Sequence, residues 1–135
     1  ACDTATDIVL TKAAQWHAKV ILSTPCCHHA LARVIDCPEL AFVTDHPFLS
    51  RKLCDVLTDA ARLARLDAEG YVTTAMELTD PDDTPKNVLL RAVLDDAPEL
   101  SRLAACRERY EAIRRFLAAG DPEGARGALP DVIYD

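Results

Sequence analysis

The chain has 135 residues, 50% of them hydrophobic and 27% charged, which suits a single globular domain. Its 22 Asp and Glu residues outnumber its 15 Lys and Arg residues, and the formal net charge of −7 disfavours capture of nucleic acid by overall charge. Apolar runs are far shorter than the ~18 residues of a membrane span, and no basic and apolar leader opens the sequence. We therefore expect a soluble, cytoplasmic protein that makes no membrane contact.

Cysteine and glycine usage argues against a disulfide-stabilised protein and against a glycine-rich nucleotide-binding loop in this chain. The irregular spacing of the six cysteines favours free thiols over a disulfide framework. All four glycines lie in the second half, so the sequence has no glycine-rich loop for a phosphate or a dinucleotide. The chain also begins with Ala1 rather than methionine, and both observations predict that it is part of a longer protein. The cysteines are Cys2, Cys26, Cys27, Cys37, Cys54 and Cys106, and the glycines are Gly70, Gly120, Gly124 and Gly127.

The first half of the chain predicts a helix, a strand and a second helix. Residues 3–17 begin with capping residues and continue with an apolar stripe at helical spacing. Residues 19–24 form a continuous apolar, β-branched run that stops at Pro25, a pattern typical of a central strand buried on both faces. Residues 29–35 suit a short helix that ends before Pro38.

The second half predicts a long helix, two strands and a last helix. Apolar residues recur at helical spacing over residues 47–69, and Gly70 follows directly. Residues 71–78 and 87–94 are typical of two strands, which we expect to pair antiparallel across a segment full of turn formers. A final helix is predicted over residues 98–119, followed by a loosely docked tail. The alternation followed by a strand pair predicts an α/β fold with a mostly parallel sheet.

Function is expected where turns follow strands, because ligands of open α/β sheets bind at the carboxyl ends of the strands. Two turns qualify. Residues 25–29 follow the first predicted strand, and residues 1–7 occupy such a turn if a strand precedes Ala1 in the intact protein. We predict that the two turns lie side by side at one rim of the sheet.

Three ordered segments resemble the C-terminal half of a class I S-adenosylmethionine-dependent methyltransferase. They read Cys2-Asp-Thr-Ala-Thr-Asp7, Val20-Ile-Leu-Ser-Thr-Pro-Cys-Cys-His-His29 and, in residues 77–91, Glu-Leu-Thr-Asp-Pro-Asp-Asp-Thr-Pro-Lys-Asn-Val-Leu-Leu-Arg. The most similar group is the bacterial methyltransferase-domain family related to the Cys-Cys-His-His tRNA ribose methyltransferases. This resemblance implies a partial Rossmann-like sheet flanked by helices, with strands five to seven and a terminal antiparallel pair.

The resemblance also implies the organisation and the partners of the chain. Residues 1–95 would form the C-terminal half of the methyltransferase domain, and residues 96–135 a helical extension and tail. The cofactor would be S-adenosylmethionine, with its glycine-rich loop in a missing N-terminal half. RNA is then the expected substrate, and the fragment is expected to be inactive alone. Whether the chain forms a homo-oligomer is left open.

Candidate site residues follow from the position of the two turns in the resemblance. Cys2 and Asp3 fall where the family places the motif beside the transferred methyl group. Methyl transfer is an in-line displacement, so the protein must aim a nucleophile and, for a hydroxyl, remove a proton. An imidazole exchanges protons near neutral pH. The candidates are Asp3, His28 and His29 for catalysis, Cys2 and Asp3 for the cofactor, and Pro25, Cys26, Cys27 and His28 for the substrate.

Each candidate also has a structural interpretation. Asp3 is suited to cap the helix that follows it, and backbone hydrogen bonds at a helix start could satisfy both histidines. Four consecutive residues at 26–29 cannot readily surround one tetrahedral zinc ion, so we expect no metal and assign the thiols to packing and pocket lining. The acidic loop at residues 79–87 lacks the glycine and terminal glutamate of a calcium loop and is expected to be a solvated turn.

Two other function classes remain open. Five arginines in residues 98–119 outnumber three glutamates, which fits either an RNA-facing or a solvated helix face. An open sheet edge would make the chain a non-catalytic binding or assembly module, which pairs with another copy or with its missing half. A zinc or redox protein built on the Cys-Cys-His-His turn is the third hypothesis.

Overall fold

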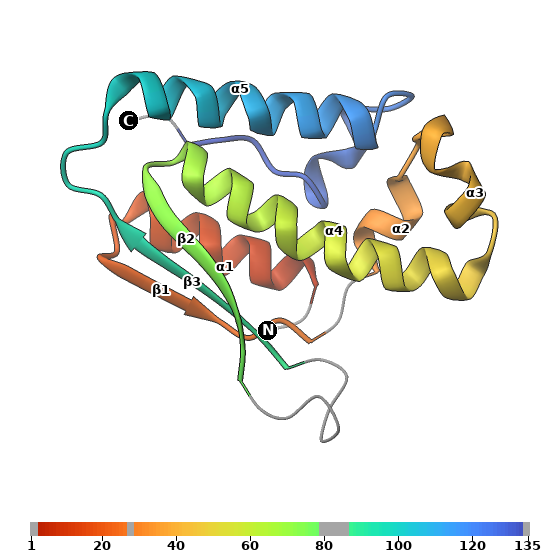
Figure 1. Cartoon of the computed structure of the whole chain (residues 1–135), viewed down its shortest axis with the longest axis horizontal. Helices are drawn as coiled ribbons and strands as arrows, with labels where there is room; N and C mark the ends of the chain where they lie inside the picture. Colours follow the sequence, from red (N-terminus) through yellow and green to blue (C-terminus); the bar gives the residue numbers. More distant parts are fainter. Residues whose placement is uncertain (1–2, 27–28, 79–86, 134–135) are drawn as a thin grey trace.

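The computed structural model describes residues 3–26, 29–78 and 87–133 (Figure 1). Among these residues, no helix combines the length and apolar character needed to cross a membrane. In chain order the elements are α1 (Thr4–Gln15), β1 (Val20–Ser23), α2 (Ala30–Val34), η1 (Pro38–Leu40), α3 (Ala41–Thr44), α4 (Pro47–Ala68), β2 (Tyr71–Glu77), β3 (Val88–Leu94), α5 (Leu100–Leu117) and η2 (Gly124–Gly127).

The three strands form one antiparallel sheet in the order β1-β3-β2. The register places Ile21 of β1 and Thr73 of β2 on either side of Ala92 of β3. The predicted antiparallel pairing of β2 with β3 is confirmed. The predicted α/β fold with a mostly parallel, partial Rossmann-like sheet is wrong, because β3 returns between its two neighbours and runs opposite to both of them.

β1 lies at an edge of this sheet, so its prediction as a central strand is also wrong. Its apolar run had indicated burial on both faces, yet only Ile21 faces the core. The opposite face carries Val20 and Leu22 of β1 together with Val72 and Met76 of β2, which are 39–62% exposed. An apolar run therefore marked a strand here without marking its place in the sheet.

The core lies between the sheet and the helices. Leu10 of α1 and Leu66 of α4 pack against Ile21, Tyr71 and Ala92 of the sheet. The chain passes from α4 into β2 through Gly70, whose φ of 95° lies in the left-handed region that favours glycine. This arrangement places α1 and α4 together on one face of the sheet (Figure 1).

The C-terminal segment completes a second part of the core. Leu117 of α5, Ala125 and Leu129 cluster with Leu31 of α2 and Cys54 of α4. The helices predicted at 29–35, 47–69 and 98–119 are confirmed as α2, α4 and α5, whereas the short helix α3 was not predicted. The tail was expected to dock loosely, but Val132 is buried. The proposed division of the chain at residue 95 stays a prediction.

Candidate functional site

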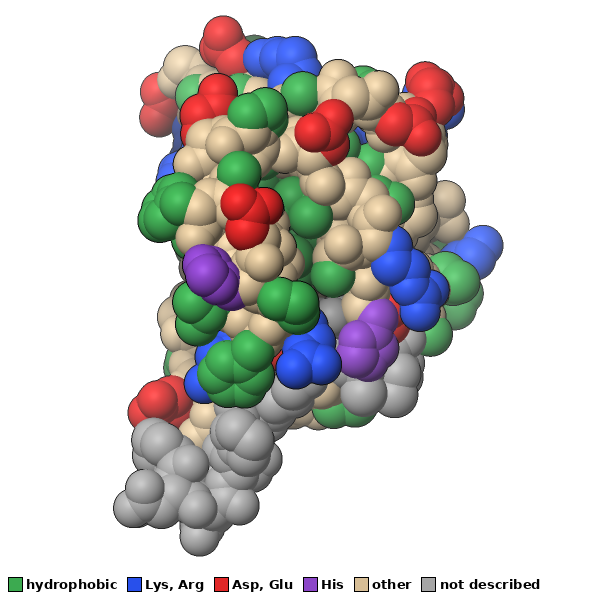
Figure 2. Space-filling model, turned by 90° about the vertical axis from the view of Figure 1, so that its right-hand side faces the viewer, with side chains coloured by type: hydrophobic (Ala, Val, Ile, Leu, Met, Phe, Trp, Pro, Cys, Tyr) green, Lys and Arg blue, Asp and Glu red, His purple; other side chains and the backbone are tan. Residues whose placement is uncertain are grey.

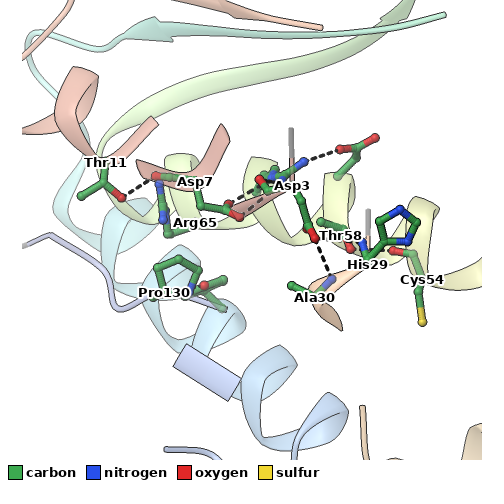
Figure 3. Close-up of polar contacts among 12 residues, drawn as sticks. Asp3, Asp7, Thr11, His29, Ala30, Cys54, Thr58, Arg65 and Pro130 are labelled. Carbon is green, nitrogen blue, oxygen red and sulfur yellow. Dashed lines mark hydrogen bonds and ion pairs between the residues drawn. The ribbon is translucent and has the colours of Figure 1, made fainter. Parts of the chain in front are cut away.

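The two predicted turns meet at Asp3. Its carboxylate oxygen Oδ2 accepts hydrogen bonds from the backbone N–H groups of His29, at 3.1 Å, and Ala30, at 3.0 Å (Figure 3). The prediction that the turns lie side by side is therefore confirmed for Asp3 and His29. Cys2, Cys27 and His28 lie outside the described residues.

Asp3 does not cap the helix that follows it, so that structural interpretation is wrong. Its side chain makes no capping bond to α1, and its two backbone partners belong to the start of α2 instead. The backbone of Asp3 has φ 51° and ψ −121°, a region that is unfavourable for residues with a Cβ atom. Such strain persists only where surrounding contacts hold the residue in place, and it is enriched at functional sites.

A buried arginine provides those contacts. Arg62 of α4 is 3% exposed, and its guanidinium binds both carboxylate oxygens of Asp7, through Nε at 3.0 Å and Nη2 at 3.1 Å. Nη2 also donates to the backbone oxygen of Asp3 at 2.7 Å, and Nη1 donates to Asp59 at 3.1 Å. Paired charge-assisted bonds of this kind are strong and directional, so Arg62 anchors the Asp3 turn to α4.

The electrostatic surroundings keep Arg62 charged. Burial lowers the pKa of its guanidinium, but the hydrogen bonds and negative charges of Asp7 and Asp59 outweigh burial and raise the pKa above its ordinary value. Sequence reasoning missed this residue because an arginine within a long helix is usually solvated. The available signals were Asp59, three residues earlier in the same helix, and the acidic residue in the first turn of α1.

The remaining predicted site residues differ in exposure. Pro25 is buried, whereas Cys26 and His29 are exposed. Leu31 belongs to the same core cluster as Cys54 of α4, and Ala30 packs against that cluster. His29 lies near Cys54 in Figure 3. These positions leave His29 open to a bound molecule while the residues behind it belong to the core.

The described cysteines are free thiols. Burial raises the pKa of the Cys54 thiol, an effect that the Ser50 hydrogen bond only partly offsets. A thiol kept protonated in this way is a poor nucleophile. Within the parts of the chain that the structure describes, no three His, Cys, Asp or Glu side chains gather as a metal would require.

Three of the five arginines of α5 bind other parts of the fold. Arg102 donates to the backbone oxygen of Tyr71 at 3.3 Å, and Arg107 donates to that of Ala68 at 3.2 Å. Arg114 pairs with Glu111 at 3.1 Å and with Asp131 at 2.8 Å. These contacts direct much of the positive charge of α5 toward its neighbours, which weakens the case for an RNA-facing surface on this helix.

Comparison with known proteins locates a resemblance on the same part of the chain. Residues 1–34 match a family model described as a methyltransferase domain. These residues are similar to a methyltransferase domain. The match covers 34 of 135 residues and contains α1, β1 and α2, and thus both turns that meet at Asp3. Searches of the curated proteins and of the solved structures found no match.

Proposed function

We propose that the chain forms part of an enzyme that transfers a methyl group from S-adenosylmethionine to RNA. The contact between Asp3 and the N–H groups of His29 and Ala30 carries the proposal, because it joins the two turns inside the stretch that is similar to a methyltransferase domain. RNA as the substrate rests on the likeness of the motif segments to the Cys-Cys-His-His tRNA ribose methyltransferases. The lack of a glycine-rich loop supports a fragment of such a domain.

The residues of the chain fit one end of this cofactor. When bound, S-adenosylmethionine supplies a methyl group on a positively charged sulfonium, and a nearby carboxylate such as Asp3 would favour that charge. The nucleotide and amino-acid ends require further groups, because none of the four glycines lies near Asp3 in the sequence. We therefore assign Asp3 to the methyl-donor side and expect another segment to hold the rest of the cofactor.

The other residues have distinct proposed roles. His29 is exposed beside Asp3 and is suited to accept a proton from a substrate hydroxyl. Pro25 and Cys26, which precede this turn, are proposed to line the substrate path together with Cys27 and His28. Arg62 is a positioning residue, since it binds the backbone oxygen of Asp3 and the carboxylate of Asp7. Cys2 is proposed to contact the cofactor.

The test uses the longest natural protein that contains this chain. Added S-adenosylmethionine should raise its melting temperature, and radiolabelled methyl groups should enter RNA in a form that ribonuclease releases. Asp3→Ala should lower methyl transfer at least about 10-fold, because it removes the carboxylate beside the donor. A protein that S-adenosylmethionine does not stabilise would overturn the proposal.

A matched variant separates this role from a general loss of carboxylate charge. Asp96 forms an exposed ion pair with Lys19 at 2.7 Å, and both side chains are more than 70% exposed. Asp96→Asn should therefore retain the full rate of methyl transfer. An equal loss of activity in Asp96→Asn and Asp3→Ala would contradict the proposed role of Asp3.

A second candidate function is assembly, which the uncovered apolar face of the sheet favours. Val20, Leu22, Val72 and Met76 share this face, and apolar surface of this kind often marks an interface. The partner would be the remainder of the methyltransferase domain or another copy of the chain. Sedimentation of the 135-residue chain should then detect oligomers that Leu22→Lys abolishes, and a monomer at micromolar concentration would contradict self-assembly.

A further inference from the structure

A pocket of about 420 Å³ lies between α4 and α5, two helices that run side by side (Figure 1). Small side chains leave room for it, namely Ala60, Ala61 and Ala64 of α4 and Cys106 of α5. The three alanines lie within four residues of one another along α4, so they share the face that α5 meets. The space between the two helices therefore follows from the small residues at these positions. The lining of this pocket includes none of the residues of the candidate site.

The wall of the pocket is apolar over most of its length. Leu57 and Leu63 of α4 and Ile113 and Phe116 of α5 flank the small residues. Phe116 is 48% exposed, so its ring lies where the pocket meets solvent. Pockets of this size with an apolar wall and a few polar groups are typical binding sites for the apolar body of a small molecule.

Polar side chains gather at one end of the pocket, where α4 ends and β2 begins. Oδ1 of Asp67 accepts a hydrogen bond from the hydroxyl of Thr73 at 2.9 Å and lies 3.8 Å from Nη2 of Arg102. Arg109 lines the pocket too, and its charge acts on Asp67. Two guanidinium groups thus face one carboxylate, which leaves this end of the pocket with a net positive charge.

Arg109 is the cation that a ligand can reach. Its side chain is exposed, and in the part of the chain that the structure describes its guanidinium forms no hydrogen bond. The residues three and four positions away along α5 lie beside it on the helix surface. All four of them are uncharged, namely Ala105, Cys106, Ala112 and Ile113. Arg109 therefore keeps donors and charge for an anionic group at this end of the pocket.

The end of the molecule formed by α2, α3 and the start of α4 differs from this pocket. Figure 2 looks onto that end, where positive, negative and apolar side chains are interspersed. Residues 33–55 carry three basic and four acidic side chains, namely Arg33, Arg51 and Lys52 with Asp36, Glu39, Asp45 and Asp55. A mixed surface of this kind selects neither an anion nor a cation. Apolar wall and unpaired charge occur together in the pocket between α4 and α5.

We propose that this pocket binds a small aliphatic carboxylate. The carboxylate pairs with Arg109, because a guanidinium offers parallel N–H donors to two oxygens. The alkyl chain lies over Ala60 and Ala64 and extends toward Phe116. At 1.5 Å per residue, Arg109 and Phe116 are about 10 Å apart along the axis of α5, which is the length of a medium alkyl chain. This binding does not depend on the proposed methyl transfer.

The test is a calorimetric titration of the 135-residue chain with octanoate, which should occupy one saturable site. Octanol has a similar chain without the charge and should bind about 5-fold more weakly. Acetate has the charge without the chain and should bind at least about 100-fold more weakly, because each buried methylene contributes to affinity. Octylammonium that binds more tightly than octanoate would make Asp67 the partner of the head group and would overturn the proposal.

Two variants of the lining separate the head group from the chain. Arg109→Gln should weaken octanoate about 5-fold and leave octanol unchanged, because only the carboxylate pairs with this residue. Ala60→Phe places a ring in the pocket and should weaken both ligands at least about 10-fold. Ala60 is exposed, so the added ring need not displace the core. Thermal unfolding checks that each variant folds.

Matched controls lie on α5 outside the pocket. Arg115→Gln removes an exposed cation, and Ala104→Phe adds a ring at an exposed alanine. Both should bind octanoate as the unmodified chain does. Equal weakening by Arg115→Gln and Arg109→Gln would overturn the pairing with Arg109. Octanoate binding that does not saturate, or that Ala60→Phe leaves unchanged in a folded protein, would overturn the pocket as the site.

Discussion

Two arginines of α4 lie three residues apart and are almost equally buried, yet their surroundings differ. Arg62 is 3% exposed and binds Asp7, Asp59 and the backbone oxygen of Asp3. Arg65 is 1% exposed, and Oε1 of Glu69 lies 3.4 Å from its Nε. Within the described structure, Nε, Nη1 and Nη2 of Arg65 form no hydrogen bond.

Arg62 makes contacts that position the Asp3 turn, whereas burial of the Arg65 charge costs free energy that no hydrogen bond of the described residues offsets. A buried charge is tolerated when hydrogen bonds replace its lost water, and Arg62 has such bonds on all three guanidinium nitrogens. These bonds connect α4 to the Asp3 turn. Arg65 lies toward α5, where its charge acts on Tyr110. We therefore expect Arg62 to stabilise the fold and the candidate site, and Arg65 to contribute much less.

Loss of Arg62 is expected to have the largest effect. Arg62→Met should reduce the free energy of unfolding by about 3–5 kcal/mol, because it leaves the carboxylate of Asp7 buried without its partner. Urea unfolding followed by circular dichroism measures this change. A loss below 1 kcal/mol would mean that the paired hydrogen bonds between Arg62 and Asp7 contribute little to stability.

Loss of Arg65 should reduce the free energy of unfolding by less than loss of Arg62, and a second substitution at Glu69 should restore it. Arg65→Met alone is expected to remove about 1–3 kcal/mol, because it takes the Arg65 charge, 3.4 Å away through Nε, from the buried carboxylate of Glu69. Adding Glu69→Gln removes that charge and keeps an acceptor for the N–H of Ile133. The double variant should recover the stability of the unmodified chain in the same urea measurement. A double variant less stable than Arg65→Met would contradict this account.

Alkaline pH should destabilise the folded protein through two buried groups, the Tyr110 hydroxyl and the Cys54 thiol. Burial raises the pKa of the Tyr110 hydroxyl above its ordinary 10.0, although Arg65 and Arg114 lower it in part, and burial likewise raises the pKa of the Cys54 thiol above 9.0. The folded protein keeps these protons where the unfolded chain loses them. Their stabilisation is therefore complete below pH 9 and declines as pH rises toward the folded-state pKa values.

The expected decline is about 1.4 kcal/mol per pH unit for each group that titrates only in the unfolded chain. Urea unfolding at a series of pH values from 8 to 11 measures it. Tyr110→Phe removes one titrating group and should show a shallower decline above pH 10. An unchanged slope in this variant would exclude Tyr110 as a cause.

An exposed ion pair should give the smallest effect. Lys19 and Asp96 lie 2.7 Å apart, closer than Arg65 and Glu69, but both side chains are largely in solvent. Asp96→Asn should change the free energy of unfolding by less than about 0.5 kcal/mol, because water screens the pair. A loss comparable to that of Arg62→Met would show that proximity, rather than burial, decides the energy of these pairs.

Much of the local structure could be predicted from the sequence. The apolar spacing of residues 47–69 predicted α4 because one stripe of that helix must face the core. The proximity of Asp3 to His29 was predicted from their places in turns. The atoms that join them were not predicted, because the carboxylate could equally have capped its own helix.

Local sequence patterns could not predict the burial of Arg62 or the order of the strands, for a related reason. An arginine in a helix has the same sequence signature whether it meets water or Asp7, and only the packing of α1 against α4 decides which. Similarly, the apolar run of β1 predicts a strand, but the return of β3 between β1 and β2 determines that β1 is an edge.

The sequence by itself determined where α1, α2, α4, α5 and the three strands form, because these depend on the spacing of apolar residues and on glycine and proline within a few positions. It also determined the methyltransferase-like segment, which lies within residues 1–34. Only the tertiary structure decided the order and direction of the strands, the burial of Arg62 and the bonds of Asp3. Each of these depends on residues distant in the chain, and desolvation and hydrogen bonding act on them only after they have been brought together.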